Sequence, residues 1–101
     1  MGNAVTVCRR DGVAPGDFRC VEIEGKRILL YDVAGVVYAT SAVCAHLGGP
    51  LDSGLFEEGV VTCPWHGWQF DVRTGESVFD PGRRIETYPV SVVGGEILVE
   101  V

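Results

Sequence analysis

The stretch that decides the fold runs from Cys44-Ala45-His46-Leu47-Gly48-Gly49-Pro50 to Cys63-Pro64-Trp65-His66-Gly67-Trp68. Each end of this stretch offers one thiolate and one imidazole, as Cys44-x-His46 and, sixteen intervening residues later, as Cys63-x-x-His66. These are the only two histidines in the sequence, and each lies within three residues of a cysteine. The pattern predicts a metal centre held by two short loops.

The ligand types narrow the choice of metal. Zinc accepts tetrahedral sets of Cys and His, but its structural sites usually pair like ligands at short spacing, whereas each loop here mixes them. A centre of two irons suits the mixture better, with Cys44 and Cys63 on one iron and His46 and His66 on the other. We therefore expect a [2Fe–2S] centre, with zinc or a redox-active dithiol as the alternatives.

The motif Cys44-x-His46-x16-Cys63-x2-His66, followed by Gly67-Trp68-Gln69-Phe70-Asp71 and Thr74-Gly75, resembles that of the Rieske-type ferredoxins. The resemblance extends over essentially the whole chain, since its length and flanking strands also fit. It implies one Rieske [2Fe–2S] cluster bound by Cys44, His46, Cys63 and His66. It further implies that single electrons pass from a flavin-dependent reductase to a terminal oxygenase of the aromatic-ring-hydroxylating type, both docking at an exposed tip formed by the two histidines.

The resemblance also assigns residues around the cluster. The loop glycines are expected to allow positive φ or a close approach of amide groups to the sulfides, and the prolines to stiffen the loops. The tryptophans either shield the cluster, form a docking surface, or belong to the core. A third loop at Asp80-Pro81-Gly82 is expected to cover the cluster. The surrounding residues are Leu47, Gly48, Gly49, Pro64, Trp65, Gly67, Trp68 and Pro81.

The neighbours of the motif bear on the reduction potential. High-potential respiratory relatives carry a bracing disulfide between the loops, and a Ser and a Tyr whose hydroxyls donate to the cluster sulfurs. Here Gly49 and Trp65 stand at the disulfide positions, Trp68 at the Ser and Phe70 at the Tyr. Because these donors are missing, we expect a potential near the low end of the class range of about −150 to +300 mV.

Charge is distributed unevenly along the chain. The net charge is −6, yet no Lys or Arg lies between residues 28 and 72. The acidic residues of that segment are Asp32, Asp52, Glu57, Glu58 and Asp71. We expect an acidic surround of the cluster, which disfavours nucleic acid and favours a basic surface on the partner. The alternative is that these are only solvated carboxylates.

Bulk properties bound the remaining choices. A chain of 101 residues predicts a single domain. No apolar run approaches a membrane span of about 18 residues, and no signal peptide is visible at the N-terminus. We expect a cytoplasmic monomer without membrane contact. Cys8 and Cys20 are expected to be free and at least partly buried, with a disulfide between them as the less favoured alternative.

Short segments of alternating polarity, separated by turn residues, predict an all-β protein. The expected strands are 4–8, 18–23, 27–33, 36–41, 55–56, 60–63, 68–72, 88–92 and 96–101, with 77–79 as a further candidate. We predict one Rieske domain over residues 1–101. Its base, a small antiparallel sandwich or barrel, comprises residues 1–42 and 70–101, and a cluster-binding subdomain of about 43–69 is inserted in it.

No catalytic constellation remains once the metal ligands are assigned, so we expect an electron carrier and not an enzyme. Three alternatives stay open: a small subunit of another complex such as nitrite reductase, the ferredoxin of a diiron monooxygenase, and the Rieske domain of an oxygenase. The Rieske domain of an oxygenase would need further histidines for the catalytic iron of that enzyme, and this sequence has no histidine beyond His46 and His66.

Overall fold

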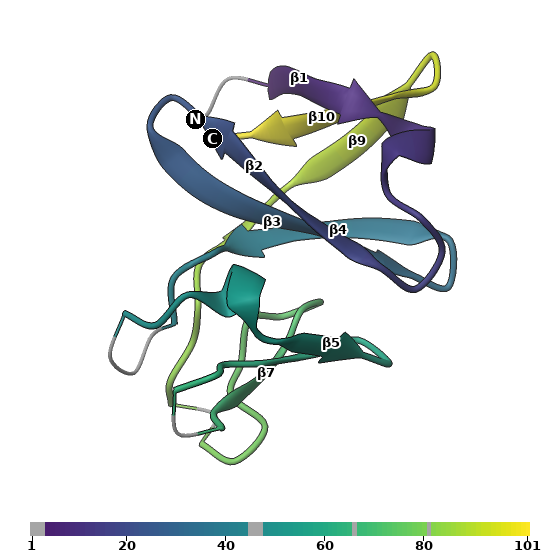
Figure 1. Ribbon diagram of the computed structural model, residues 1–101. Helices are drawn as coiled ribbons and strands as arrows, with labels where there is room; N and C mark the ends of the chain where they lie inside the picture. Colours follow the sequence, from purple (N-terminus) through teal and green to yellow (C-terminus); the bar gives the residue numbers. More distant parts are fainter. Residues whose placement is uncertain (1–3, 45–47, 66, 81) are drawn as a thin grey trace.

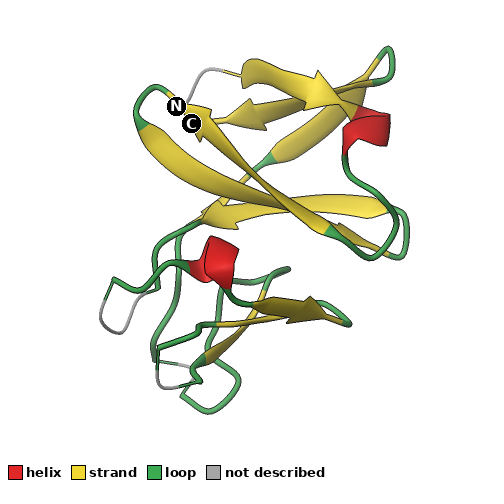
Figure 2. Ribbon diagram, viewed as in Figure 1, coloured by secondary structure: helices red, strands yellow, loops and turns green. Residues whose placement is uncertain are grey.

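The computed structural model describes residues 4–44, 48–65, 67–80 and 82–101. These residues form ten strands and two short 3-10 turns, and no α-helix (Figures 1 and 2). The strands make three antiparallel sheets, so the predicted all-β class is confirmed. Nowhere in the described ranges is there a helix long and apolar enough to cross a membrane.

The first sheet joins the two ends of the chain. Its order is β1 (Ala4–Arg9), β10 (Glu96–Glu100) and β9 (Val90–Val93). In β10 the side chains alternate, with Ile97 and Val99 buried and Glu96, Leu98 and Glu100 exposed or half-buried. This is the period of two that a half-buried strand requires. The sheet therefore covers one side of the neighbouring sheet at the top of Figure 1.

The second sheet has the order β2 (Phe18–Ile23), β3 (Lys26–Val33), β4 (Val36–Ser41) and β8 (Thr87–Tyr88). Its two hairpins turn at Glu24-Gly25 and Ala34-Gly35, where both central residues have positive φ. Such turns match the right-handed twist of paired strands. They fix the registers Ile23↔Lys26 and Val33↔Val36.

The third sheet forms the lower lobe in Figure 1 and consists of β5 (Leu55–Glu57), β6 (Val60–Thr62) and β7 (Gln69–Asp71). A 3-10 turn at Leu51–Ser53 leads into β5. The inward side chains of this sheet include Val61 and Phe70, which are fully buried. The sheet matters for function because both predicted ligand loops adjoin it.

Strand β3 separates two hydrophobic cores, since it is buried on both faces. Ile28 and Leu30 face the upper core, whereas Leu29 and Tyr31 face the lower core. The upper core consists of Val13, Ile23, Ile28, Leu30, Val37, Ala39, Ile97 and Val99. The lower core consists of Leu29, Tyr31, Ala42, Cys44, Leu51, Val61, Cys63, Phe70, Val72 and Ile85. Both motif cysteines thus belong to the lower core.

The predicted strands agree with the structure to within a residue at each end except at 88–92 and 77–79. The single strand predicted at 88–92 is two strands, β8 and β9, which belong to different sheets, and Pro89 between them has no N–H to continue a ladder.

The candidate strand 77–79 does not form. There Ser77 makes only an isolated bridge to Phe70, and Val78 and Phe79 are largely exposed. The Val78 amide donates to the carbonyl of Gln69 at 2.9 Å and the Ser77 amide to the carbonyl of Arg83 at 2.8 Å, so this segment makes isolated hydrogen bonds to two neighbours and no continuous ladder. The division into a base of 1–42 and 70–101 and an inserted subdomain of 43–69 stays a prediction.

Candidate metal centre

Two buried cysteine thiols lie side by side in the lower core. Cys44 follows strand β4 and Cys63 follows strand β6, and both are free and almost completely buried. Burial raises the pKa of the Cys63 thiol, and the adjoining Cys44 thiol raises that pKa further. A bound metal cation reverses this effect, because it stabilises the thiolate form of its ligands. The pair therefore fits a site for a thiophilic metal such as iron.

The first loop, residues 44–50, is closed by its own backbone. The Cys44 N–H donates to the Gly49 carbonyl at 2.8 Å, and the Gly48 N–H donates to the Cys44 carbonyl at 2.9 Å. Gly48 has φ of +73°, a value that favours glycine. The backbone thus returns to Cys44 within a few residues. His46 and Leu47 of this loop lie outside the described residues.

The second loop, residues 63–68, is closed in a similar way. The Cys63 N–H donates to the Trp68 carbonyl at 2.7 Å, and Gly67 has φ of +71°. The Trp65 N–H points at the Cys63 sulfur, 3.4 Å away. This donor stabilises negative charge on the sulfur. His66 lies outside the described residues, so the placement of both histidine ligands stays a prediction.

Gly49 joins the two loops by close contact. A Cβ atom built on it would lie 2.8 Å from the Cys63 sulfur and 3.0 Å from a ring carbon of Trp65. Gly49 has no positive φ, so its role is to let the loops approach and not to permit an unusual backbone. The expected positive φ is confirmed at Gly48 and Gly67, whereas the expected approach of loop amides to the cluster sulfides stays a prediction.

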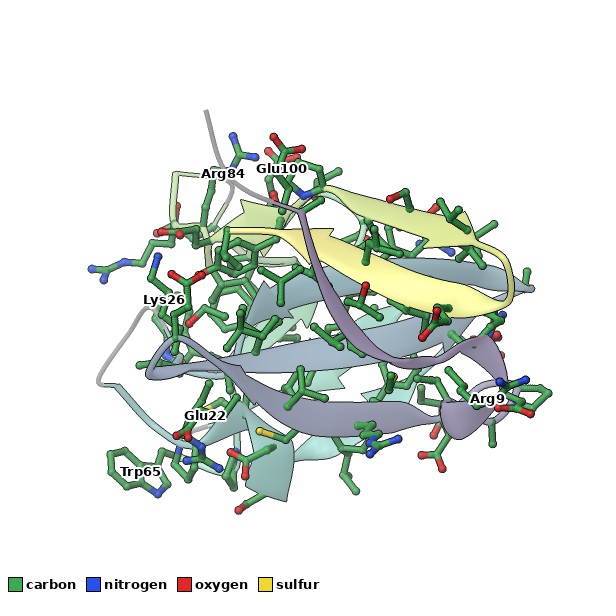
Figure 3. All side chains as sticks on the ribbon, turned by 90° about the horizontal axis from the view of Figure 1, so that it is seen from above. Arg9, Glu22, Lys26, Trp65, Arg84 and Glu100 are labelled. Atoms are coloured by element: carbon green, nitrogen blue, oxygen red, sulfur yellow. The ribbon has the colours of Figure 1, made fainter. Side chains whose placement is uncertain are left out.

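The structure assigns different surroundings to the two tryptophans. Trp65 is 49% exposed and projects from the edge of the molecule (Figure 3). Trp68 is partly buried against the lower core, with its ring 6.4 Å from that of Phe70. Trp65 is therefore open to a partner, whereas Trp68 is a core residue of the loop. Pro64, which lies between Cys63 and Trp65 in the sequence, is exposed.

The third loop reaches the second through an arginine. Gly82 donates to the Asp80 carboxylate at 3.1 Å, which shapes a tight turn. Directly after it, the Arg83 guanidinium lies over the Trp68 ring, with 5.3 Å between its Cζ and the ring centroid. The third loop therefore contacts the second loop. That it covers the cluster stays a prediction, and Pro81 itself lies outside the described residues.

The expected acidic surround holds only in part. Three of the five carboxylates of the 28–72 segment pair with arginines from outside it. The pairs are Asp32–Arg10 at 2.5 Å, Asp52–Arg27, and Asp71–Arg73 at 3.5 Å. Counting charges along the sequence overestimates the acidity, because folding brings Arg10 and Arg27 beside carboxylates more than twenty residues away, and Arg73 lies just beyond the segment beside Asp71.

Sequence reasoning missed two residues that matter at the site. Arg83 carried no signal beyond its position after the Asp80-Pro81-Gly82 loop. Gly54 gave a weak signal, because it is a glycine between a turn and a strand. Only the structure shows that the carbonyl oxygen of Thr62 occupies the space that a side chain at this position would need.

Comparison with known proteins agrees with this geometry. The family model of the Rieske [2Fe–2S] domain matches residues 3–89. The ferredoxin component of the naphthalene 1,2-dioxygenase system of Pseudomonas aeruginosa is 36% identical over 89 residues, which cover 87% of this chain and 86% of the relative. This relative is similar in length as well as in sequence.

Solved structures share the fold. The ferredoxin of carbazole 1,9a-dioxygenase from Nocardioides aromaticivorans IC177 superposes with a TM-score of 0.88 at 33% identity, covering 96% of both chains. A chain in the complex of reduced oxygenase and oxidized ferredoxin of carbazole 1,9a-dioxygenase gives a TM-score of 0.89 at 30% identity, covering 99% of this chain and 94% of the other. This protein therefore belongs to the Rieske [2Fe–2S] domain family, as a ferredoxin that carries electrons.

Proposed function

We propose that the protein is the ferredoxin component of an aromatic-ring-hydroxylating dioxygenase system. It takes single electrons from a flavin-dependent reductase and delivers them to a terminal oxygenase. The observation that carries this proposal is similarity over most of both chains to ferredoxin components of such systems. The complex in the carbazole system supports the oxygenase as a partner.

Four residues hold the cluster in this proposal. Cys44 and Cys63 bind one iron through their buried thiolates, and His46 and His66 bind the other. The bound cluster supplies a one-electron couple. The chain itself closes both loops by backbone hydrogen bonds and excludes water from the sulfurs, since both cysteines are at most 3% exposed.

The potential lies near the low end of the Rieske range. Trp68 and Phe70 replace the two hydroxyl donors of the high-potential relatives, and both rings pack in or against the lower core. Without those donors the reduced, negatively charged cluster loses stabilisation. A low potential suits a protein that donates electrons to an oxygenase.

Partners dock at the histidine tip, beside the exposed indole of Trp65. Aromatic residues are enriched at protein interfaces, and Trp65 is half exposed next to the second loop. The protein works as a cytoplasmic monomer, in keeping with short-lived contacts to two partners in turn.

Voltammetry and EPR of the purified protein test the proposal. A rhombic signal of the dithionite-reduced state with a low average g, and a potential well below zero, are expected. The Cys63→Ser variant should lose both the rhombic EPR signal and the electrochemical response of the cluster. A potential above about +100 mV would contradict the low-potential assignment. Zinc in place of iron would overturn the ligand assignment.

The partner assignment needs its own assay. The protein should restore product formation when it replaces the ferredoxin in a reconstituted naphthalene dioxygenase system, with Cys63→Ser as the control. Full reduction by the reductase without any transfer to the oxygenase would show that another acceptor is served.

A further inference from the structure

We propose that Arg83 tunes the reduction potential of the cluster from outside the ligand set, by holding a positive charge over Trp68. The inference deepens the proposed function, since it rests on the proposed ligands. Arg83 acts through its charge: its guanidinium lies over the ring of Trp68, in the loop that begins with the proposed ligand Cys63.

The geometry links Arg83 to the cysteines through one side chain. The guanidinium carbon lies 5.3 Å from the centroid of the Trp68 ring, within the distance of about 6 Å that defines a cation–π contact. The ring packs against the lower core, which contains both Cys44 and Cys63. The Trp68 carbonyl accepts the Cys63 N–H at 2.7 Å, so Trp68 also closes the loop that begins with this ligand.

The backbone of the third loop fixes Arg83 in place. Its N–H donates to the Asp80 carbonyl at 2.9 Å, and its own carbonyl accepts the Ser77 N–H at 2.8 Å. The Asp80 carboxylate lies 3.8 Å from the Arg83 Nε, and both side chains are about half exposed. An exposed pair of this kind interacts weakly. The backbone hydrogen bonds, and not this ion pair, therefore hold Arg83 in place, and the Asp80→Asn variant measures how far the carboxylate opposes the arginine charge.

Electrostatics gives the direction of the effect. The oxidised cluster with two thiolates and two neutral imidazoles carries no net charge, and the added electron makes it −1. A fixed cation nearby stabilises the reduced form, which raises the potential. An indole ring lies on the path from Arg83 to the lower core, so this path is less screened than one through water. The same argument makes Asp80 lower the potential.

The experiment compares two neighbouring arginines in the cluster-loaded protein. Arg83→Gln removes the charge over Trp68. Arg84→Gln removes an identical charge one residue away, where the guanidinium donates to the Thr74 carbonyl at 2.8 Å. Arg83→Lys keeps the charge, and Asp80→Asn removes the opposing one while keeping an oxygen for the Gly82 amide. Iron content and EPR g values are measured alongside, so that a changed ligand set is recognised.

We expect Arg83→Gln to lower the reduced-to-oxidised ratio at a fixed potential at least threefold. This corresponds to about −28 mV at 59 mV per tenfold change for one electron. Arg84→Gln should shift the ratio by less than a third as much on a logarithmic scale. Arg83→Lys should keep at least half of the wild-type effect, and Asp80→Asn should shift the potential upward. Because the Arg83 side chain is about half exposed, raising the salt concentration should reduce the Arg83→Gln difference.

Equal shifts in Arg83→Gln and Arg84→Gln would overturn the proposal, because net charge alone would then explain them. Identical potentials for Arg83→Lys and Arg83→Gln would overturn it as well. A wild-type protein that lacks the EPR signal of a histidine-ligated cluster would instead reject the proposed function, which separates the two failures.

Discussion

Replacing Gly54 by alanine should be among the most damaging small changes in the lower lobe. Gly54 has φ of −89°, which any residue adopts, so the effect is purely steric. An added Cβ would lie 1.9 Å from the carbonyl oxygen of Thr62. Ordinary contact begins near 3.4 Å, so the two segments must separate by about 1.5 Å (3.4 minus 1.9). The atom that must move is backbone, in a strand paired on both sides.

The structure sets the magnitude. Overpacking a well-packed interior costs about 1–3 kcal/mol, and more where the surroundings cannot relax. Because Thr62 is held by both Leu55 and Gln69, we expect about 3 kcal/mol, the upper end of that range. For a domain of this size this lowers the unfolding midpoint by about 12–24 °C. Cys63 follows Thr62 directly, so the iron content per chain should fall too.

Gly82→Ala is the matched control. Its added Cβ would lie in the same lobe, with its nearest contact 3.3 Å away at a carboxylate oxygen of Asp80, the end of a flexible side chain. The assay is thermal unfolding followed by far-UV circular dichroism, together with iron per chain. If Gly54→Ala unfolds within about 4 °C of Gly82→Ala, a difference of under about 1 kcal/mol, the steric reasoning is refuted.

Two further predictions concern buried polar groups. Tyr31→Phe removes a hydroxyl that lies 2.8 Å from that of Thr40. Because the Thr40 hydroxyl still donates to a backbone carbonyl, urea unfolding should show a loss of stability of only about 1 kcal/mol. A loss above about 3 kcal/mol would contradict this expectation. The Arg10 guanidinium, followed by two backbone amides, holds the pKa of Asp32 below its usual value. This stabilisation is present above the unfolded pKa of about 3.9 and is lost as the pH falls through the lower folded value. Asp32→Asn should therefore flatten the acid limb of stability below about pH 4, and an unchanged limb in pH-dependent urea unfolding would contradict the assignment.

Much of the fold could be predicted because its signals are local. The limits of the strands Phe18–Ile23 and Val36–Ser41 were predicted correctly, since the first ends and the second begins at a turn that contains a glycine. The apolar run Ile28-Leu29-Leu30 predicted burial on both faces, and all three residues are fully buried. The candidate strand 77–79 was wrong, because this segment makes only isolated hydrogen bonds to Gln69 and Arg83, and the extent of pairing is not encoded in the segment itself. The strand expected at 88–92 was also wrong, because it divides at Pro89 between two sheets.

The sequence by itself determined the all-β class, and it predicts the ligand types and their spacing, because these depend on side-chain chemistry and on periods of two along the chain. Only the tertiary structure decided which side chains the arginines meet. Arg27 lies beside Asp52, and Arg83 lies over Trp68, although nothing in the sequence pairs them. The same holds for Gly49 against the sulfur of Cys63. Such contacts follow from strand register and loop closure, which place residues far apart in sequence within a few ångströms of each other in space.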